Sequence, residues 1–257
     1  MFFCYLTVPY PVNVAFTTSH LFRSIGTTHP LRGWLGMHKE PLDIDAVFER
    51  LRRAVADLPK AAMFDLRDQG YGSPFEQLVG SLISARTRDE TTVEVCLRLF
   101  AEVRTPQEFA DLPEDRLITL LNGATFPEPK ARDLKVIARQ LLDDYGGAVP
   151  DSLAELTAFR GVGPKIAALT LAVGFDRPAI AVDVHVHRIT NRWGYVATTS
   201  PERTMLALEK ILPQRYWIEI NERLVPFGKF ICTAARPKCS TCLLLSMCRQ
   251  VGVVNPR

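Results

Sequence analysis

The 257-residue sequence contains little that would place the protein in a membrane or in a disulfide-stabilised class. No run of eighteen apolar residues occurs, so no membrane-spanning helix is expected. Six cysteines are too few and too unevenly placed for a disulfide framework in a chain of this length. The net charge is only +3, which permits a polyanionic partner without indicating one. Low-complexity tracts and repeats of fixed period are also absent.

The first 36 residues contain no acidic side chain. They combine aromatic residues, Thr and Ser with Arg23 and Arg32, which is a composition typical of a transit peptide. An upstream extension, with the working protein starting near Met37, explains the same composition. We favour the extension, because no clear amphipathic helix precedes Gly36.

After Met37 the hydrophobic spacing predicts one helix after another, with few alternating patterns that would indicate strands, and hence an all-α fold. Asp45 is expected to cap the first helix. Ser73, followed by Pro74 and Glu76, has the signature of a capping box at a helix start. A second capping box, expected over residues 87–90, would leave Arg86 at an exposed junction between two helices. Further helices are predicted over residues 106–121, 130–145, 152–159, 164–173, 184–193, 201–212 and 217–230.

Four of the cysteines lie within seventeen residues near the end of the chain. Six residues separate Cys232 from Cys239, two separate Cys239 from Cys242, and five separate Cys242 from Cys248. Four thiolates at such spacing can surround one compact metal centre, and a [4Fe–4S] cluster needs four Cys ligands. Zinc is the alternative, although zinc sites commonly use paired CxxC units. Cys96 lies among apolar residues of a predicted helix and is expected to be a small buried hydrophobe.

The second motif is a glycine-containing connection between two predicted helices. Gly161, Val162 and Gly163 precede Pro164, where the next helix is expected to begin. Glycines allow a tight turn and close approach of another chain, and unpaired N–H groups at a helix start attract phosphate. The pattern indicates a helix-hairpin-helix that holds a DNA backbone without reading sequence. An ordinary turn between two helices has the same pattern.

The third motif is Lys165 with Asp183, eighteen residues downstream. Taken singly, Lys165 could be a surface lysine in a first helical turn, and Asp183 could simply cap the helix that follows. Their combination with the other two motifs favours a chemical role.

In order and spacing these motifs resemble the endonuclease III family. The resemblance is carried by residues 161–165, residues 182–188 and the cysteine loop, and residues 73–76 and 84–89 match the family's early helices. It covers roughly residues 40 to 250.

The resemblance implies an all-α fold of two domains with a DNA-binding cleft between them. A six-helix barrel containing the helix-hairpin-helix is expected over residues 67–177. An iron–sulfur cluster domain is expected to combine residues 37–66 with residues 178–257, and residues 1–36 form an extension of unknown role.

The resemblance also implies base excision repair by a bifunctional DNA glycosylase and AP lyase. Its partner is double-stranded DNA carrying damaged bases, in particular oxidised pyrimidines, or abasic sites, and the strand is cleaved 3′ to the site by β-elimination. Lys165 is expected to attack C1′, and Asp183 to assist proton removal. Cys232, Cys239 and the pair Cys242 and Cys248 are expected to bind a [4Fe–4S] cluster. We expect a monomer in the cytoplasm with the bacterial nucleoid; organellar targeting by the extension stays open.

The DNA contacts implied by the resemblance involve a larger set of residues. Arg86 stands where the family usually has Gln, and is expected to fill the gap left by a flipped base. Phe126 is expected to supply a wedge. The hairpin residues Gly161, Val162 and Gly163 are expected to hold the backbone. His185 is expected to orient the site or to pack beneath it, and we favour packing. In addition, Arg160 and Pro164 exchange the Pro and Arg common in the family, and Pro164 removes one N–H that could bind phosphate.

Two alternatives remain open at this stage. An adenine glycosylase shares the cysteine pattern but only hydrolyses the base; that family lacks the hairpin lysine and has a Glu near the position of Ser81. A non-catalytic DNA-binding protein could use the cluster as a structural or redox module.

Overall fold

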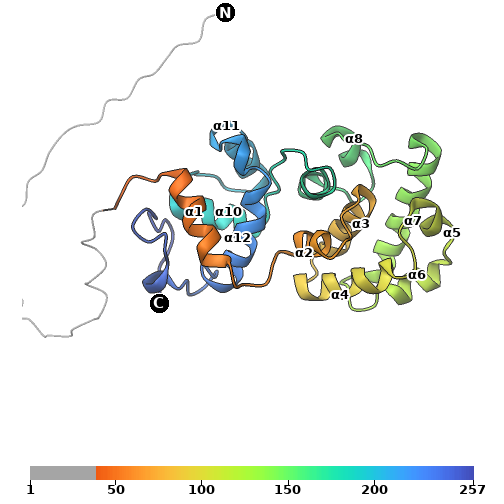
Figure 1. Ribbon diagram of the computed structural model, residues 1–257, viewed down its shortest axis with the longest axis horizontal. Helices are drawn as coiled ribbons and strands as arrows, with labels where there is room; N and C mark the ends of the chain where they lie inside the picture. Colours follow the sequence, from red (N-terminus) through yellow and green to blue (C-terminus); the bar gives the residue numbers. More distant parts are fainter. Residues whose placement is uncertain (1–38) are drawn as a thin grey trace, which may run out of the picture. The chain divides into compact units, whose positions relative to one another are not determined.

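The computed structural model describes residues 39–257, and within that range every regular element is helical (Figure 1). The all-α fold expected from the hydrophobic spacing is confirmed. The extension over residues 1–36, with its two interpretations, lies outside the described residues. In the range that is described, no helix is both long enough and apolar enough to cross a membrane.

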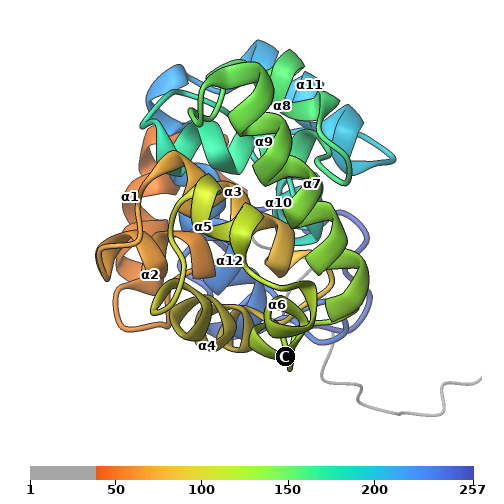
Figure 2. The same cartoon turned by 90° about the vertical axis from the view of Figure 1, so that its right-hand side faces the viewer.

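The first of two hydrophobic cores is built mainly from residues 61–173. Its elements are α2 (Ala62–Asp68), α3 (Pro74–Ser84), α4 (Asp89–Phe100), α5 (Pro106–Asp111), α6 (Glu114–Leu120), α7 (Pro127–Tyr145), α8 (Leu153–Ala158), α9 (Pro164–Leu169) and the π-helical turn η2 (Thr170–Gly174). Helix α3 contacts α2, α4, α7, α9 and η2, and Figure 2 shows it among these neighbours. Because α3 is enclosed, its position fixes the turn that follows it at Arg86.

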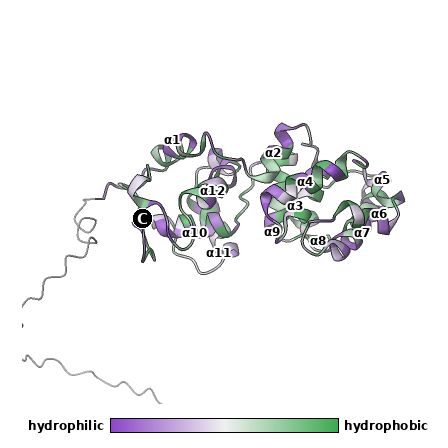
Figure 3. Ribbon diagram, turned by 90° about the horizontal axis from the view of Figure 1, so that it is seen from below, coloured by the Kyte–Doolittle hydropathy of each residue, from purple (hydrophilic) through white to green (hydrophobic). Residues whose placement is uncertain are grey.

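The second core joins the beginning of the described chain to its end. Its helices are α1 (Ile44–Val55), α10 (Val184–Trp193), α11 (Pro201–Ile211) and α12 (Glu219–Phe230), and the loop after α12 packs against them. Hydrophobic and hydrophilic residues alternate along most helices in Figure 3, as expected for helices with one buried face. The buried residues of segment 61–66 belong to the first core, although the sequence analysis grouped residues 37–66 with the cluster domain. The division of the chain into two domains stays a prediction.

The helix starts show which local signals were sufficient. The capping box at Ser73 is confirmed, because Ser73 Oγ accepts from the Glu76 N–H and the Glu76 carboxylate accepts from the Ser73 N–H. The expected cap at Asp45 is wrong by two residues: Asp43 caps α1. Asp45 instead accepts a hydrogen bond from the Tyr216 hydroxyl at 2.6 Å, a partner far away in the sequence.

The second expected capping box is also wrong. Helix α4 begins after Arg88, which makes no side-chain cap. Thr87 Oγ1 accepts hydrogen bonds from the Thr125 N–H and from Lys130 Nζ instead. The threonine is therefore occupied by a neighbouring loop rather than by the helix that follows it.

Two predicted helices are interrupted. The helix expected over residues 106–121 is split into α5 and α6 at Pro113, because proline disfavours a helical conformation in the residue before it; Leu112 is extended, with ψ 130°. The helix expected over residues 164–173 is regular only as far as Leu169, the end of α9, and then continues as the π-helical turn η2. There Gly174 packs against the start of α3 so closely that a Cβ atom would lie 2.8 Å from Pro74 Cα.

An ion pair between a buried glutamate and a half-exposed arginine secures the beginning of α3. Glu76 is 2% exposed, and besides its capping contacts it accepts a hydrogen bond from Arg104 Nε at 2.6 Å. A buried carboxylate is tolerated only when its lone pairs and its charge have partners. Arg104 therefore stabilises the helix that leads to the Arg86 turn.

We predict that Arg104→Gln lowers the free energy of unfolding by about 2 kcal/mol, because Glu76 stays buried without its cation. Urea unfolding measures this change. Arg116→Gln is the matched control, since the pair of Arg116 with Glu102 is exposed on both sides and should contribute below about 1 kcal/mol. Equal losses in the two variants would contradict the interpretation.

Candidate active site and four-cysteine loop

Lys165 lies in the first turn of α9, directly after the glycine hairpin. Gly163 is the N-cap of α9 and Pro164 is its first residue. Gly161 has φ 78°, and a Cβ there would also lie 3.2 Å from an Asp133 carboxylate oxygen, so this turn needs glycine. The helix, hairpin and helix that the sequence predicted are present as α8, residues 159–163 and α9.

Asp183 is the N-cap of α10. Its Oδ1 accepts hydrogen bonds from the N–H groups of His185 and Val186, both at 2.9 Å. Within residues 39–257, Oδ2 accepts no hydrogen bond from the protein. One oxygen therefore fixes the helix start, and the other stays available to a bound group.

Lys165 and Asp183 line the same open cavity, which has a volume of about 700 Å³. Pockets that hold ligands begin at roughly 300 Å³, so a nucleotide-sized group has room here. A second cavity, of about 620 Å³, joins Lys165 to the hairpin glycines and to Ser81. Among the described residues, Lys165 has no carboxylate oxygen within the 4.0 Å that defines an ion pair. The structure thus places the lysine and the aspartate that the sequence paired along one cavity, and this cavity is open to solvent.

His185 lines the cavity of Lys165 and Asp183, but its ring is also engaged from behind. Arg188 Nη2 donates to His185 Nδ1 at 3.1 Å. The backbone of α12 approaches so closely that a Cβ on Gly228 would lie 2.4 Å from Nδ1. Burial lowers the pKa of His185, and the Asp183 charge opposes that shift. His185 is therefore a packed, predominantly neutral imidazole at neutral pH.

Arg86 and Phe126 lie at two exposed turns. Arg86 lines the two open cavities described above, whereas Phe126 lines neither. Phe126 is nevertheless 55% exposed, which is unusual for a large aromatic side chain. A hydrogen bond from Thr125 Oγ1 to the Arg86 carbonyl, at 2.9 Å, places the two turns next to each other.

The sequence analysis missed an ion-pair cluster in the same cavity. Lys229 Nζ from α12 contacts Asp89 at 3.1 Å and Glu90 at 2.6 Å, both at the start of α4. Glu202 lines the cavity from α11. Asp89 belongs to a motif that was noted in the sequence, but its partner is 140 residues away, and no local signal connects them.

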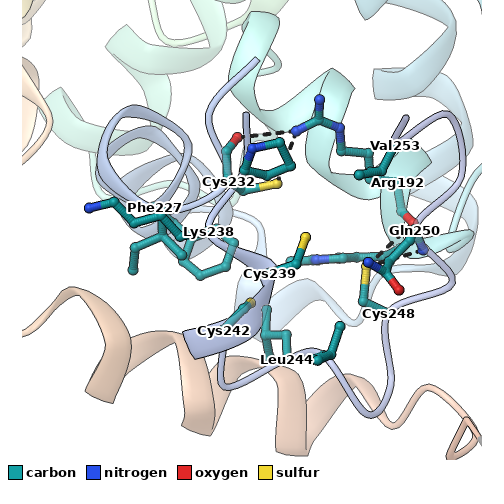
Figure 4. Close-up of a pocket in the computed structure, with 14 residues that line it drawn as sticks. Arg192, Phe227, Cys232, Lys238, Cys239, Cys242, Leu244, Cys248, Gln250 and Val253 are labelled. Carbon is teal, nitrogen blue, oxygen red and sulfur yellow. Dashed lines mark hydrogen bonds between the residues drawn. The ribbon is translucent and has the colours of Figure 1, made fainter. Parts of the chain in front are cut away.

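The four cysteines lie around one cavity, shown in Figure 4. Cys232 follows α12, Cys239 begins a short 3₁₀ turn, η4 (Cys239–Thr241), and Cys242 and Cys248 follow. The guanidinium of Arg192, from α10, reaches this loop and donates to Cys232 Sγ at 3.4 Å. Arg192 also donates to the carbonyls of residues 233 and 234, at 2.8 and 2.6 Å.

Thiols dominate the donor atoms of this cavity, and no His, Asp or Glu lines it. Burial raises the pKa of Cys242 to about 12 and that of Cys248 to about 11. As free thiols they are neutral at pH 7, and a bound cation would be needed to ionise them. In the described part of the chain, no three His, Cys, Asp or Glu side chains converge closely enough to hold one metal ion. Cys96 is fully buried in the first core, as the sequence predicted.

Comparison with known proteins agrees with this geometry. Residues 79–214 match the family described as HhH-GPD superfamily base excision DNA repair protein. Endonuclease III of Thermotoga maritima is 46% identical over 71% of this chain and 85% of that protein. Endonuclease III homolog 2, chloroplastic, of Arabidopsis thaliana is 40% identical over 71% of this chain, which spans only half of that longer protein.

A solved structure of a trapped covalent intermediate of endonuclease III with DNA has a TM-score of 0.71 and 31% identity. The match covers 80% of this chain and 94% of that one. The sequence, the helical architecture and the Lys165 cavity thus lead to the same conclusion: the chain belongs to the endonuclease III family, within the HhH-GPD superfamily of base excision DNA repair proteins.

Proposed function

We propose that this enzyme removes oxidised pyrimidines from double-stranded DNA and then cleaves the strand 3′ to the abasic site, with Lys165 as nucleophile and Asp183 as its partner. The observation that carries the proposal is the shared cavity of Lys165 and Asp183 beside the glycine hairpin. An open cavity of this size accepts a nucleotide only after the nucleotide has left the base stack.

Lys165 attacks C1′ of the flipped nucleotide through its amine. The bond from C1′ to the base breaks as the bond from nitrogen to C1′ forms, and the departing base takes the electron pair. Loss of a proton from the nitrogen and opening of the sugar ring, in which O4′ takes up a proton, then produce a Schiff base. Removal of a proton from C2′ expels the 3′ phosphate by β-elimination, and hydrolysis of the imine by water frees Lys165. The attacking amine must be neutral to act as a nucleophile.

Asp183 provides the negative charge of the site. Its Oδ1 is held by two N–H groups of α10, so Oδ2 is presented from a rigid helix start. An ionised carboxylate in this place stabilises the positive charge that develops on the sugar as the base departs, and it can receive the proton from the amine.

The groups around this pair hold the DNA. The hairpin of Gly161, Val162 and Gly163 contacts the phosphate backbone through the N–H groups of its two glycines, since the Val162 N–H already donates to the Phe159 carbonyl at 3.1 Å. Arg86 and Phe126 fill the space that the flipped nucleotide leaves. His185 supports the wall of the cavity from below, in agreement with its contacts to Arg188 and α12.

Cys232, Cys239, Cys242 and Cys248 are proposed to bind a [4Fe–4S] cluster. Each thiolate in such a cluster ligates a different iron, so the sulfur atoms need not converge on one point, whereas zinc requires all four within about 2.3 Å of one ion. The four thiols around one cavity, with no His, Asp or Glu among its lining residues, match the all-cysteine ligand set of such a cluster. A bound cluster would cross-link the loop over residues 232–248 through its four cysteines. Arg192 holds the first ligand by its sulfur and by the carbonyl groups that follow.

The nearest rival is a monofunctional adenine glycosylase. It is disfavoured because Lys165 occupies the hairpin and Ser81, rather than a carboxylate, lies on α3 at the edge of the second cavity. A non-catalytic role is disfavoured because Lys165 and Asp183 share a cavity open to solvent. We further propose a monomer of two domains, located in the cytoplasm with the DNA.

We predict that Lys165→Gln abolishes strand cleavage and the covalent adduct formed with DNA under borohydride, because the amide cannot form an imine. Circular dichroism should show an unchanged helical fold. Lys210→Gln, an exposed change on α11, is the control and should keep both activities. A covalent adduct that persists in Lys165→Gln would assign the nucleophile to another amine.

We predict that Asp183→Asn binds DNA normally but turns over at least about a hundredfold more slowly, since an amide keeps the cap and loses the charge. Asp43→Asn is a matched control: Asp43 caps α1 through the same two bonds, to the N–H groups of residues 45 and 46, but lies in no proposed site. Single-turnover excision measures the difference. Near-native excision by Asp183→Asn would reduce Asp183 to a helix cap.

We predict that the purified protein is brown, with about four iron and four sulfide per chain. Cys239→Ser should lose most of both, whereas Cys96→Ser, in the first core, should retain them. Metal and sulfide analysis decides the question. A colourless protein with one zinc bound at the same cysteines would overturn the cluster assignment.

A further inference from the structure

Arg86 and Phe126 share an unusual backbone conformation. Their φ angles are 60° and 58°, in the left-handed region that side chains other than glycine avoid. Such strained residues persist only where the surrounding structure holds them. Each turn therefore needs an identifiable support.

Lys130, near the start of α7, supports the Arg86 turn. Its ammonium donates to the carbonyls of Ile83 at 2.6 Å and Ala85 at 2.9 Å, and to Thr87 Oγ1 at 3.0 Å. An ammonium has three hydrogens, so all its donors are directed at the residues on either side of Arg86. The lysine satisfies carbonyls at the end of α3 and thereby fixes where the turn begins and ends.

Thr125 links the Arg86 turn to the Phe126 turn directly. Its N–H donates to Thr87 Oγ1 at 3.1 Å, and its own Oγ1 donates to the Arg86 carbonyl at 2.9 Å. Thr125 immediately precedes Phe126, and Lys130 lies four residues beyond Phe126. The residues that support the Arg86 turn, Thr125 and Lys130, therefore lie on the two sides of Phe126.

The partial burial of Lys130 indicates that its ammonium is held in place by these hydrogen bonds and is not a freely solvated surface charge. The lysine is half-buried, and burial lowers its pKa to about 8. It remains mostly protonated at pH 7 and keeps its three donors there. Thr87, which the sequence suggested as a helix cap, is the acceptor shared by Lys130 and Thr125.

We propose that Thr87, Thr125 and Lys130, here called the loop-bridging cluster, hold the Arg86 and Phe126 turns as one preformed unit that enters the DNA when a nucleotide is flipped. These three are positioning residues that act through Arg86 and Phe126, and the inference rests on the proposed glycosylase function for its substrate. A preformed unit does not have to be ordered upon binding, so its loss should slow flipping and excision.

Thr125→Val tests the link between the turns with little change of shape. It removes the hydrogen bond to the Arg86 carbonyl, and the loss of about one hydrogen bond corresponds to about fivefold slower single-turnover excision of thymine glycol from a duplex. The fluorescence of 2-aminopurine placed beside the lesion should rise more slowly by a similar factor, because it reports unstacking. Thr119→Val is the matched control, since Thr119 Oγ1 bonds only to a carbonyl within α6.

Lys130→Met gives a second test with a closely matched control on the same helix. Lys135 donates in the same manner to the carbonyls of Ala110 and Leu112 at the end of α5, away from both turns. We expect Lys130→Met and Lys135→Met to lower the melting temperature similarly, but only Lys130→Met to slow flipping, by about tenfold or more. Equal effects of the two variants on flipping, or none from Thr125→Val, would overturn the proposal.

The background of Arg86→Ala with Phe126→Ala shows whether the cluster acts through these two residues. Adding Thr125→Val there should cause no further loss, whereas an undiminished fivefold loss would contradict a positioning role. Failure of the proposed function is distinguishable, because it would appear as a wild-type protein without excision of thymine glycol and without a borohydride adduct. If the wild-type protein is active and Thr125→Val excises and flips at the same rate, the proposal for the loop-bridging cluster is refuted while the proposed function stands.

Discussion

The two hydrogen bonds that Asp183 accepts at the start of α10 anchor the helix that lies between the Lys165 cavity and the four-cysteine loop. They orient α10 at the cavity, and the same helix then carries Arg188 and Arg192 towards the four-cysteine loop. Arg188 Nη2 donates to the carbonyls of Gly228 and Cys232, each at 3.0 Å, and to His185. One helix therefore fixes the Asp183 carboxylate at its first turn and contacts the cysteine loop along its length.

This arrangement connects the four-cysteine loop, where we propose a metal centre, to the cavity of Asp183 through one helix. Arg192 is 8% exposed, and its charge is compensated by the carbonyls and the Cys232 sulfur of the loop. The guanidinium thus ties the loop to α10 through protein groups alone, and a cluster proposed at the four cysteines would hold the same loop in place. Support of the site through Arg188 and Arg192 requires no redox chemistry.

The sequence was informative wherever the signal was local. The Ser73 capping box, the start of α9 at Pro164 and the bounds of α10 could be predicted from neighbouring residues, and the structure confirms them. Local reasoning failed where a distant group competed for the same side chain. Tyr216 binds Asp45, which left the cap of α1 to Asp43.

The site was affected by the same limitation. Thr87 had the spacing of a cap, yet Thr125 and Lys130 occupy its hydroxyl. The cluster of Lys229 with Asp89 depends on α12 meeting α4, and no periodicity within either segment reveals it. The motif containing Lys165 and Asp183 could be identified because, together with the cysteine loop, it resembles the endonuclease III family in order and spacing, but the space between the two side chains is a property of the fold.

The central claim, that Lys165 is the amine that joins the DNA, is tested most directly in the unaltered enzyme. Reduction with borohydride during reaction on an abasic-site duplex converts the imine to a stable amine, and proteolysis with mass spectrometry then locates the modified residue. The account predicts a sugar remnant on the peptide that contains Lys165. A remnant on Lys130, on Lys229 or on any other amine, or a wild-type enzyme that cleaves without any adduct, would contradict it.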